Sequence, residues 1–256
     1  MLTDLIPLAL DTMALLLLAT FIAGFIDAIG GGGGLIVVPA LMLAGLTPTQ
    51  ALATNKVQAI FGTVAAVRNY ARLGLVSPQR QVIPVIACFL AGLLGASLIA
   101  VVPVGILDRI LPVVMIGLAL FFLLRKGLDD VDRVARMRPE LYSITIVPVI
   151  ACYDGLFGPG AGTFYMMGFV TLAGFGMLRA TAHTKMLNMG SNIGSLTGFT
   201  LMGEPQWILG LIIGVAAYGG ARLGARMAAR VGARLIRPLL VVTSTGMAVK
   251  LLLEQA

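Results

Sequence analysis

The stretch AIGGGGGLIVVPALMLAGLTPTQALATNK, residues 28–56, joins a run of glycines to two apolar segments and ends on a lysine. Five consecutive glycines at 30–34 leave the backbone without side chains, and Lys56 places a charge inside a long apolar region. Buried backbone groups and charges are unfavourable unless polar partners surround them. We therefore expect both features to face a polar cavity inside the protein.

The composition of the whole chain indicates a polytopic membrane protein. Of its 256 residues 59% are hydrophobic and only 11% are charged, and the mean hydropathy is +1.00. Soluble domains carry about 25% charged residues, so this chain is typical of membrane proteins. Its net charge of +7 comes without a basic patch interleaved with aromatics, which argues against nucleic acid as a partner. The two cysteines define no metal or cofactor site.

Ten apolar segments form two groups of five around one polar stretch. A helix needs about 20 residues to cross a bilayer, and the second and seventh segments are short and led by glycines, which predicts discontinuous helices. The expected divisions are a first repeat at 1–125, a polar cytoplasmic linker at 126–140 and a second repeat at 141–256. The segments span residues 5–26, 32–46, 49–70, 81–102, 106–124, 141–157, 161–175, 178–201, 205–229 and 235–253.

An internal duplication relates the two groups. When the sequence is shifted by 129 positions, Ala51 falls on Ala180 and Lys56 falls on Lys185. The glycine runs GGGGG (30–34) and GPGAG (158–162) align at the same shift or one less. We therefore expect an all-α fold of two repeats.

Charge decides how the two repeats are oriented. Three arginines lie between the third and fourth segments, whereas the equivalent loop of the second half carries only Glu204. The next loop of the second half carries four arginines: Arg226, Arg230, Arg234 and Arg237. If every segment crosses, all clusters share one side, which the positive-inside rule makes cytoplasmic. The sequence thus predicts inverted repeats in a cell inner membrane, with both termini extracytoplasmic.

The glycine runs are candidate anion-binding loops. Glycines allow backbone N–H groups to line a cavity and allow a helix to begin with its positive end toward an anion. The alternative is that they permit close helix packing, and we assign Gly220-x-x-x-Gly224 and Ala91-x-x-x-Gly95 to packing. The candidate backbone ligands are Gly31, Gly32, Gly33, Gly160 and Gly162.

Two lysines at equivalent positions are the candidate charged ligands. Intramembrane charges usually face a cavity or a partner, although Lys56 and Lys185 could instead extend to the interface. Amide and hydroxyl groups lie beside them, and on the second helix they recur along one face. The predicted substrate-binding side chains are Thr54, Asn55, Lys56, Lys185, Asn188 and Asn192.

Three further ionisable residues are candidates for proton coupling. Asp27 and Asp154 precede the two glycine loops, where they could neutralise the lysines, carry protons or sit at a hydrated helix end. His183 is the single histidine and could carry a proton or simply hydrogen-bond at a helix end.

These motifs resemble the TauE/SafE sulfite exporter family over nearly the whole chain. The resemblance rests on GFIDAIGGGGGLIVVPALMLAGLTPTQALATNKVQAIFGT (24–63), YDGLFGPGAGTFYMMGF (153–169) and RATAHTKMLNMGSNIGSLTGF (179–199). It implies outward transport of small sulfur-containing anions such as sulfite or organosulfonates.

The resulting hypothesis is a secondary transporter, without a cofactor, whose repeats rock to give alternating access. No GxxxxGK[ST] motif is present for ATP hydrolysis. The alternatives are an anion channel and, from the intramembrane aspartates or a serine–histidine pair, a hydrolase, although GxGD and GxSG motifs are absent. Glycine stripes leave a homodimer open.

Overall fold

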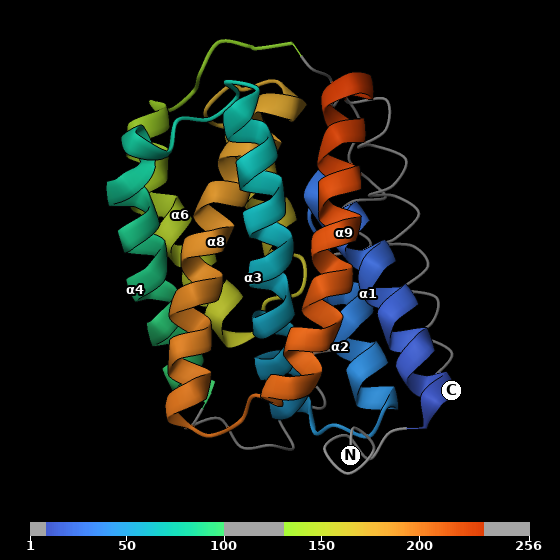
Figure 1. The fold of residues 1–256 in the computed structure, drawn as a ribbon. Coiled ribbons are helices and arrows are strands. Elements are labelled where there is room, and N and C mark those ends of the chain that lie inside the picture. The colour runs from blue at the N-terminus through green and yellow to red at the C-terminus, as the bar shows by residue number, and fades with distance from the viewer. Residues whose placement is uncertain (1–8, 100–130, 233–256) are drawn as a thin grey trace, which may run out of the picture.

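A computed structural model describes residues 9–99 and 131–232, and these residues form helices and connecting loops without a strand (Figure 1). The helices occur in the order expected from the apolar segments. Segments 106–124 and 235–253 lie outside the described residues, so the five-plus-five repeat stays a prediction, as does the placement of the termini. The helices are α1 (Leu10–Gly30), α2 (Gly34–Leu43), α3 (Pro48–Arg72), the 3₁₀ turn η1 (Pro78–Gln81), α4 (Val82–Ile99), α6 (Pro139–Leu156), α7 (Ala161–Thr171), α8 (Met177–Leu201) and α9 (Trp207–Val231).

Three described helical stretches are long and apolar enough to cross a membrane: α1, η1 together with α4, and α9. Helices α3 and α8 have 25 residues each, about 37 Å at 1.5 Å per residue, but they carry polar side chains that the other helices bury. Helices α2 and α7 have only 10 and 11 residues, so neither covers the roughly 30 Å of hydrocarbon alone.

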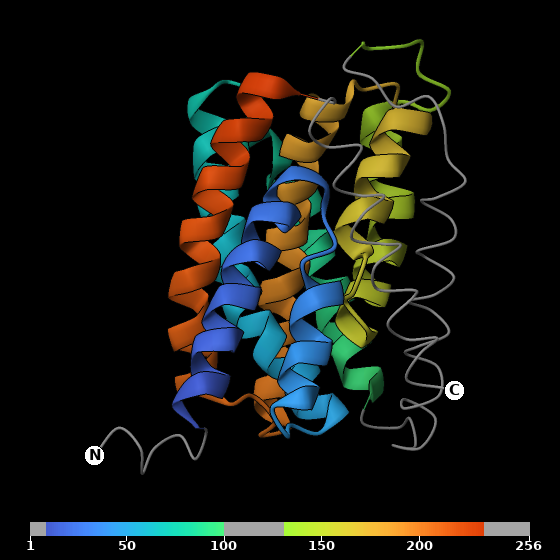
Figure 2. The same cartoon turned by 90° about the vertical axis from the view of Figure 1, so that its right-hand side faces the viewer.

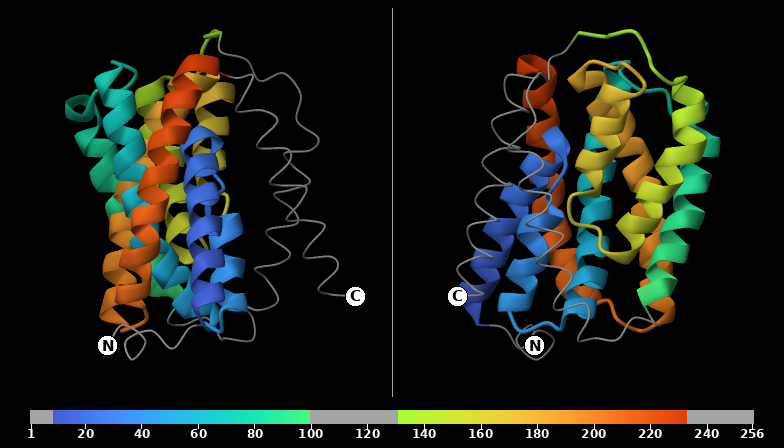
Figure 3. Two further views of the ribbon diagram at one scale, coloured as in Figure 1. Left: turned by 45° about the vertical axis from the view of Figure 1, so that its right-hand side comes forward. Right: turned by 180° about the vertical axis from the view of Figure 1, so that it is seen from behind.

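The short helices belong to two hairpins that enter the bundle from opposite ends. Helix α1 rises from one end, the chain breaks at the glycines inside the bundle, and α2 returns to the same end (Figure 2). Helices α6 and α7 form the corresponding hairpin from the other end (Figure 3). The expectation that every segment crosses therefore does not hold for α2 and α7. Each hairpin nevertheless returns to its own side, so the C-terminal ends of α3 and α9 and the N-terminal ends of α6 and α8 share one end.

Local sequence explains where the central helices begin. Thr47 accepts a hydrogen bond from the backbone of Gln50, whose side chain accepts one from the backbone of Thr47, and Pro48 occupies the first turn. A capping box is therefore present at the start of α3. The bounds of α3 and α8 are offset by 129 positions at both ends, as the duplication predicts.

The fourth helix of each half packs mainly on the other half. Helices α3 and α8 contact each other, α9 lies along α1 and α3, and α4 lies along α6 and α8. We call α1, α2, α3 and α9 the first body, and α4, α6, α7 and α8 the second body. Each body thus combines three helices of one sequence half with one helix of the other.

Small residues allow these close contacts. A Cβ atom on Gly220 or Gly224 of α9 would overlap the carbonyl of Phe21 or Phe25 on α1. A Cβ atom on Gly95 of α4 would overlap a carbonyl of α6 in the same way. The packing role assigned to these glycines is therefore confirmed.

The described part of the polar linker, residues 131–138, is not helical. The carboxylate of Asp132 accepts a hydrogen bond from Gly176 N at 2.6 Å and pairs with Arg179 at 2.7 Å. The backbone of Arg133 donates to the carbonyl of Gly174 at 2.7 Å. These contacts hold the segment against the turn between α7 and α8.

Candidate functional site

The two glycine loops meet in the interior of the bundle. Gly31 has a φ of 85°, and a Cβ atom there would lie 2.6 Å from the backbone nitrogen of Thr163. Gly160, the residue before α7, has a φ of 81°. These backbone conformations favour glycine, and the missing side chains let the loops that lead into α2 and α7 approach each other.

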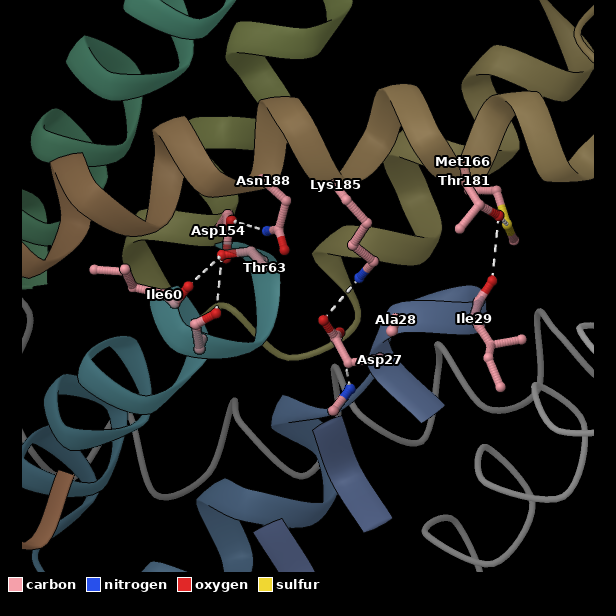
Figure 4. Close-up of polar contacts among 12 residues, drawn as sticks. Asp27, Ala28, Ile29, Ile60, Thr63, Asp154, Met166, Thr181, Lys185 and Asn188 are labelled. Atoms are coloured by element: carbon pink, nitrogen blue, oxygen red, sulfur yellow. Dashed lines mark hydrogen bonds and ion pairs between the residues drawn. The ribbon is translucent and has the colours of Figure 1, made fainter. Parts of the chain in front are cut away.

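The first ion pair lies beside this crossing. The Lys56 ammonium is 2.6 Å from one carboxylate oxygen of Asp154, and the side chains are only 1% and 2% exposed. Lys56 also donates to the main-chain carbonyl of Asp154. The other carboxylate oxygen accepts a hydrogen bond of 2.7 Å from Asn188 Nδ2 (Figure 4). It accepts a second one from Ser191 Oγ. The carboxylate is therefore held by three side chains of α3 and α8.

The second ion pair has the same design with the halves exchanged. The Lys185 ammonium is 2.7 Å from a carboxylate oxygen of Asp27 (Figure 4). The other oxygen of Asp27 accepts a hydrogen bond of 3.2 Å from the backbone N–H of Gly33 in the glycine run. Lys185 is fully buried, whereas Asp27 is 23% exposed. This pair is therefore less enclosed than the first.

Each ion pair joins the two sequence halves. Lys56 on α3 pairs with Asp154 on α6, and Lys185 on α8 pairs with Asp27 on α1. The two ammonium groups and the two carboxylates sum to zero charge when all four are ionised. Of the three roles left open for the aspartates, neutralisation of the lysines is the one that the geometry displays.

A small polar cavity of about 30 Å³ lies between the ion pairs and the glycine loops. On this measure one water molecule needs about 10–15 Å³, so the space holds about two water molecules and a sulfonate or sulfite needs a wider cavity. Backbone glycines and polar side chains of four helices form most of its wall. Its lining comprises Ala23, Gly24, Asp27, Gly32, Gly33, Gly34, Asn55, Lys56, Gln58, Ala59, Gly62, Asp154, Gly158, Gly160, Gly162, Asn188 and Asn192.

Most of the predicted site residues meet at this cavity, but four are placed differently. Gly31 lies at the contact between the loops, and Lys185 reaches the cavity only through Asp27. Thr54 turns to α9, where its hydroxyl accepts a hydrogen bond of 3.0 Å from Gln206 N. Thr54 thus fixes a helix end and does not face the cavity.

His183 is the fourth. Its Nδ1 contacts the Gln81 side chain, and its ring packs on Phe169 and Phe175. These residues line a separate cavity of about 510 Å³ beside η1. Although His183 is near Lys185 in sequence, it is not among the residues around the ion pairs.

Two residues outside the predicted substrate-binding set also belong to this site. Ser191 donates to Asp154, and Gln58 lines the cavity while donating to Asn55 at 2.8 Å. Ser191 lies three residues after Asn188, a spacing that keeps both on one helix face. Extending the polar stripe by that spacing would have found it.

The hydrolase alternatives find no support in these contacts. Each aspartate is paired with a lysine, and the serines of α8 bond to Asp154 or to backbone carbonyls, whereas His183 contacts Gln81. Among residues 9–99 and 131–232, no group of three His, Cys, Asp or Glu side chains could hold a metal ion.

Comparison with known proteins is consistent with this arrangement. The family model "Sulfite exporter TauE/SafE" matches residues 16–251. "Probable membrane transporter protein ORF9" of Sinorhizobium sp is 47% identical over 96% of this chain and 95% of its own length. "Probable membrane transporter protein YfcA" of Escherichia coli K12 is 42% identical over 94% and 90%, and a "Probable membrane transporter protein" of Haemophilus influenzae is 38% identical over 97% of both chains. No solved structure matches the chain.

The match of the family model over most of the chain, together with relatives aligned over nearly their full length, establishes that this chain belongs to the TauE/SafE sulfite exporter family of membrane transporters.

Proposed function

We propose that the protein is a secondary transporter that exports small sulfur-containing oxyanions, such as sulfite or an organosulfonate, across a cell inner membrane. The observation that carries the proposal is the pair of buried lysines, one from each sequence half, of which Lys56 lines a cavity walled by glycine backbone and Lys185 contacts it through Asp27. Planar or tetrahedral oxyanions accept hydrogen bonds from ammonium groups and from backbone N–H groups. Family membership supports the sulfur-containing class of substrate and the outward direction.

Charge balance argues that the aspartates act in the transport cycle. A buried ion pair contributes little net stability because both groups lose their hydration. With both lysines paired, the site is neutral and holds no surplus positive charge for an anion. Protonation of Asp27 or Asp154 would release one lysine, so that a monoanion and a proton would occupy the site together without net charge.

The small cavity supports a closed state between two open ones. An oxyanion fits only after the first and second bodies separate at the face between α3 and α8. Rocking of the bodies would open the cavity first to one side and then to the other, as transporters with inverted repeats do. The ion pairs would re-form in the empty, closed protein.

Transport by the purified protein in liposomes tests the proposal. We expect the wild type to transport labelled sulfite or a small organosulfonate, and Lys56→Met or Lys185→Met to abolish transport while the protein stays folded. Arg138→Gln, at an exposed position before α6, serves as the control and should transport normally. Normal transport by both lysine variants would refute the site. Transport by the wild type that is unchanged when the proton gradient is collapsed would refute the proton coupling.

A further inference from the structure

A second polar cavity, of about 270 Å³, lies between α3 and α9 toward their C-terminal ends. Four arginines line it, two from each helix, together with Asn69 and Tyr218. The four are Arg68, Arg72, Arg222 and Arg226. Within the described part of the chain none of these arginines forms an ion pair with a carboxylate. The cavity, which we call the arginine cavity, therefore concentrates positive charge without a carboxylate counter-charge from residues 9–99 or 131–232.

The spacing of the arginines makes this concentration unfavourable for the protein alone. Within each helix the two arginines are four residues apart, which places like charges on the same face, where they repel. The positive-inside rule and the helix dipoles favour arginine at these helix ends, but neither requires four of them around one cavity. Arg230, in the last turn of α9, satisfies both rules and does not line the cavity.

An unused donor also lies at this cavity. The Asn69 side-chain nitrogen is buried and has no hydrogen-bond partner among the described residues. The four arginines are exposed, and their guanidinium groups together with the buried Asn69 amide N–H offer several donors to one cavity, which matches a group with several anionic oxygens.

The arginine cavity is adjacent to the central one. Gly62 of α3 lines the central cavity, and Ala65, one turn later on the same face, lines the arginine cavity. The wall between them at Gly62 is formed by small residues: a Cβ atom on Gly62 would lie 3.7 Å from Ala221 Cβ and 3.9 Å from the Ala217 carbonyl oxygen. A slight separation of α3 from α9 would join the two cavities.

We propose that the arginine cavity binds an oxyanion and that it is the station through which the transported anion reaches the central cavity from the arginine-bearing end. The second part rests on the proposed transport function. The first part does not, because binding of an oxyanion can be measured without transport.

The binding test uses Lys56→Met/Asp154→Asn, in which the first ion pair is replaced by neutral side chains. In nanodiscs of zwitterionic lipid, we expect this variant to bind methanesulfonate and sulfite in calorimetric titrations. Adding Arg222→Gln/Arg226→Gln should weaken binding about tenfold or more, since two charge-assisted contacts are lost. Arg222→Lys/Arg226→Lys should recover part of the affinity, and Arg230→Gln should leave it unchanged. Binding that is indifferent to Arg222 and Arg226 would overturn the site.

The transport test asks whether the station is used. With the central site intact, Arg222→Gln/Arg226→Gln should raise KM about tenfold and change kcat less than twofold, in zwitterionic liposomes. The methyl group added by Gly62→Ala makes only ordinary contacts. This variant should lower kcat and leave anion binding at the arginine cavity intact. Gly219→Ala serves as its control.

The outcomes separate the two proposals and the two sources of oxyanion. An unchanged KM in the arginine variant would refute the station while the transport function stands. Failure of the wild type to transport, with binding still dependent on Arg222 and Arg226, would refute the transport function and the station but leave the oxyanion site. If the wild-type cavity is occupied only in discs containing anionic lipid, and free methanesulfonate and sulfite do not bind, the group bound is a lipid headgroup and the station is refuted.

Discussion

Replacement of Asp154 by asparagine isolates the charge of the more buried ion pair. The substitution keeps the shape of the side chain and an oxygen that can accept a hydrogen bond, but it removes the negative charge opposite Lys56. Both side chains are at most 2% exposed, so water does not replace the lost partner. Loss of one member of a buried ion pair costs about 3–5 kcal/mol, which corresponds to a fall in Tm of about 6–20 °C for a protein of this size.

The second ion pair provides the internal comparison. Asp27 is 23% exposed, so the cost of Asp27→Asn should be smaller, about 1–3 kcal/mol, between the values for exposed and buried pairs. The double variant Lys56→Met/Asp154→Asn, which leaves no unpaired charge, should recover at least half of the Tm lost in Asp154→Asn. All three variants should lose transport coupled to protons.

Thermal unfolding in one detergent, followed by intrinsic fluorescence, measures the stabilities, and liposome flux measures transport. Equal Tm losses for Asp154→Asn and Asp27→Asn would contradict the assignment of the cost to burial. Failure of the double variant to regain stability would show that the pair contributes through packing or hydrogen bonding instead of charge. Wild-type transport by the double variant would remove the ion pair from the cycle altogether.

Three further substitutions probe the scaffold. Gly220→Ala should destabilise the protein by about 1–3 kcal/mol or more, because the added Cβ atom overlaps the carbonyl of Phe21. Gly219→Ala on the same helix should be neutral. The Tm values of the two variants measure the difference. Thr54→Val should destabilise the protein by about 1 kcal/mol, the free energy typical of one hydrogen bond, and so lower Tm. It should leave the KM for the anion unchanged. The backbone N–H at the start of α8, with a smaller contribution from the neighbouring Arg179, lowers the pKa of Asp132 in the folded protein. The ionised Asp132 therefore stabilises the fold fully above its unfolded pKa of about 4. This stabilisation is lost as the pH falls through the lower pKa of the folded state. Asp132→Asn should accordingly lower Tm at pH 7 but not at strongly acidic pH, without affecting transport.

The sequence predicted which polar residues lie together better than it predicted the path of the chain. Hydropathy and the 129-residue shift located the helices, the glycine loops and the equivalent lysines because each leaves a local signal. The partners of the lysines were left open, since the contacts of Lys56 with Asp154 and of Lys185 with Asp27 span 98 and 158 positions. Such pairings depend on how the hairpins cross.

Whether the second and seventh segments cross the membrane was also left open. Apolar composition does not distinguish a helix that crosses from one that returns, because both are surrounded by apolar neighbours. The glycine runs marked the breaks, but the direction of the chain after Gly33 follows from the contact between the two loops. His183 was misplaced for a related reason: it lies two positions before Lys185, and this spacing turns its ring to another face of α8.

The exchange of α4 and α9 between the halves bears on how such a chain could have arisen. A single half would lack the helix that covers its own α3 or α8, and its lysine would have no aspartate to pair with. A half-length ancestor would therefore have functioned as two copies inserted into the membrane in opposite orientations. The fourth helix and the carboxylate of each copy would have packed against the other copy. On this view gene fusion joined two antiparallel copies that had associated as separate chains. The two halves, co-expressed as separate chains, should therefore still associate.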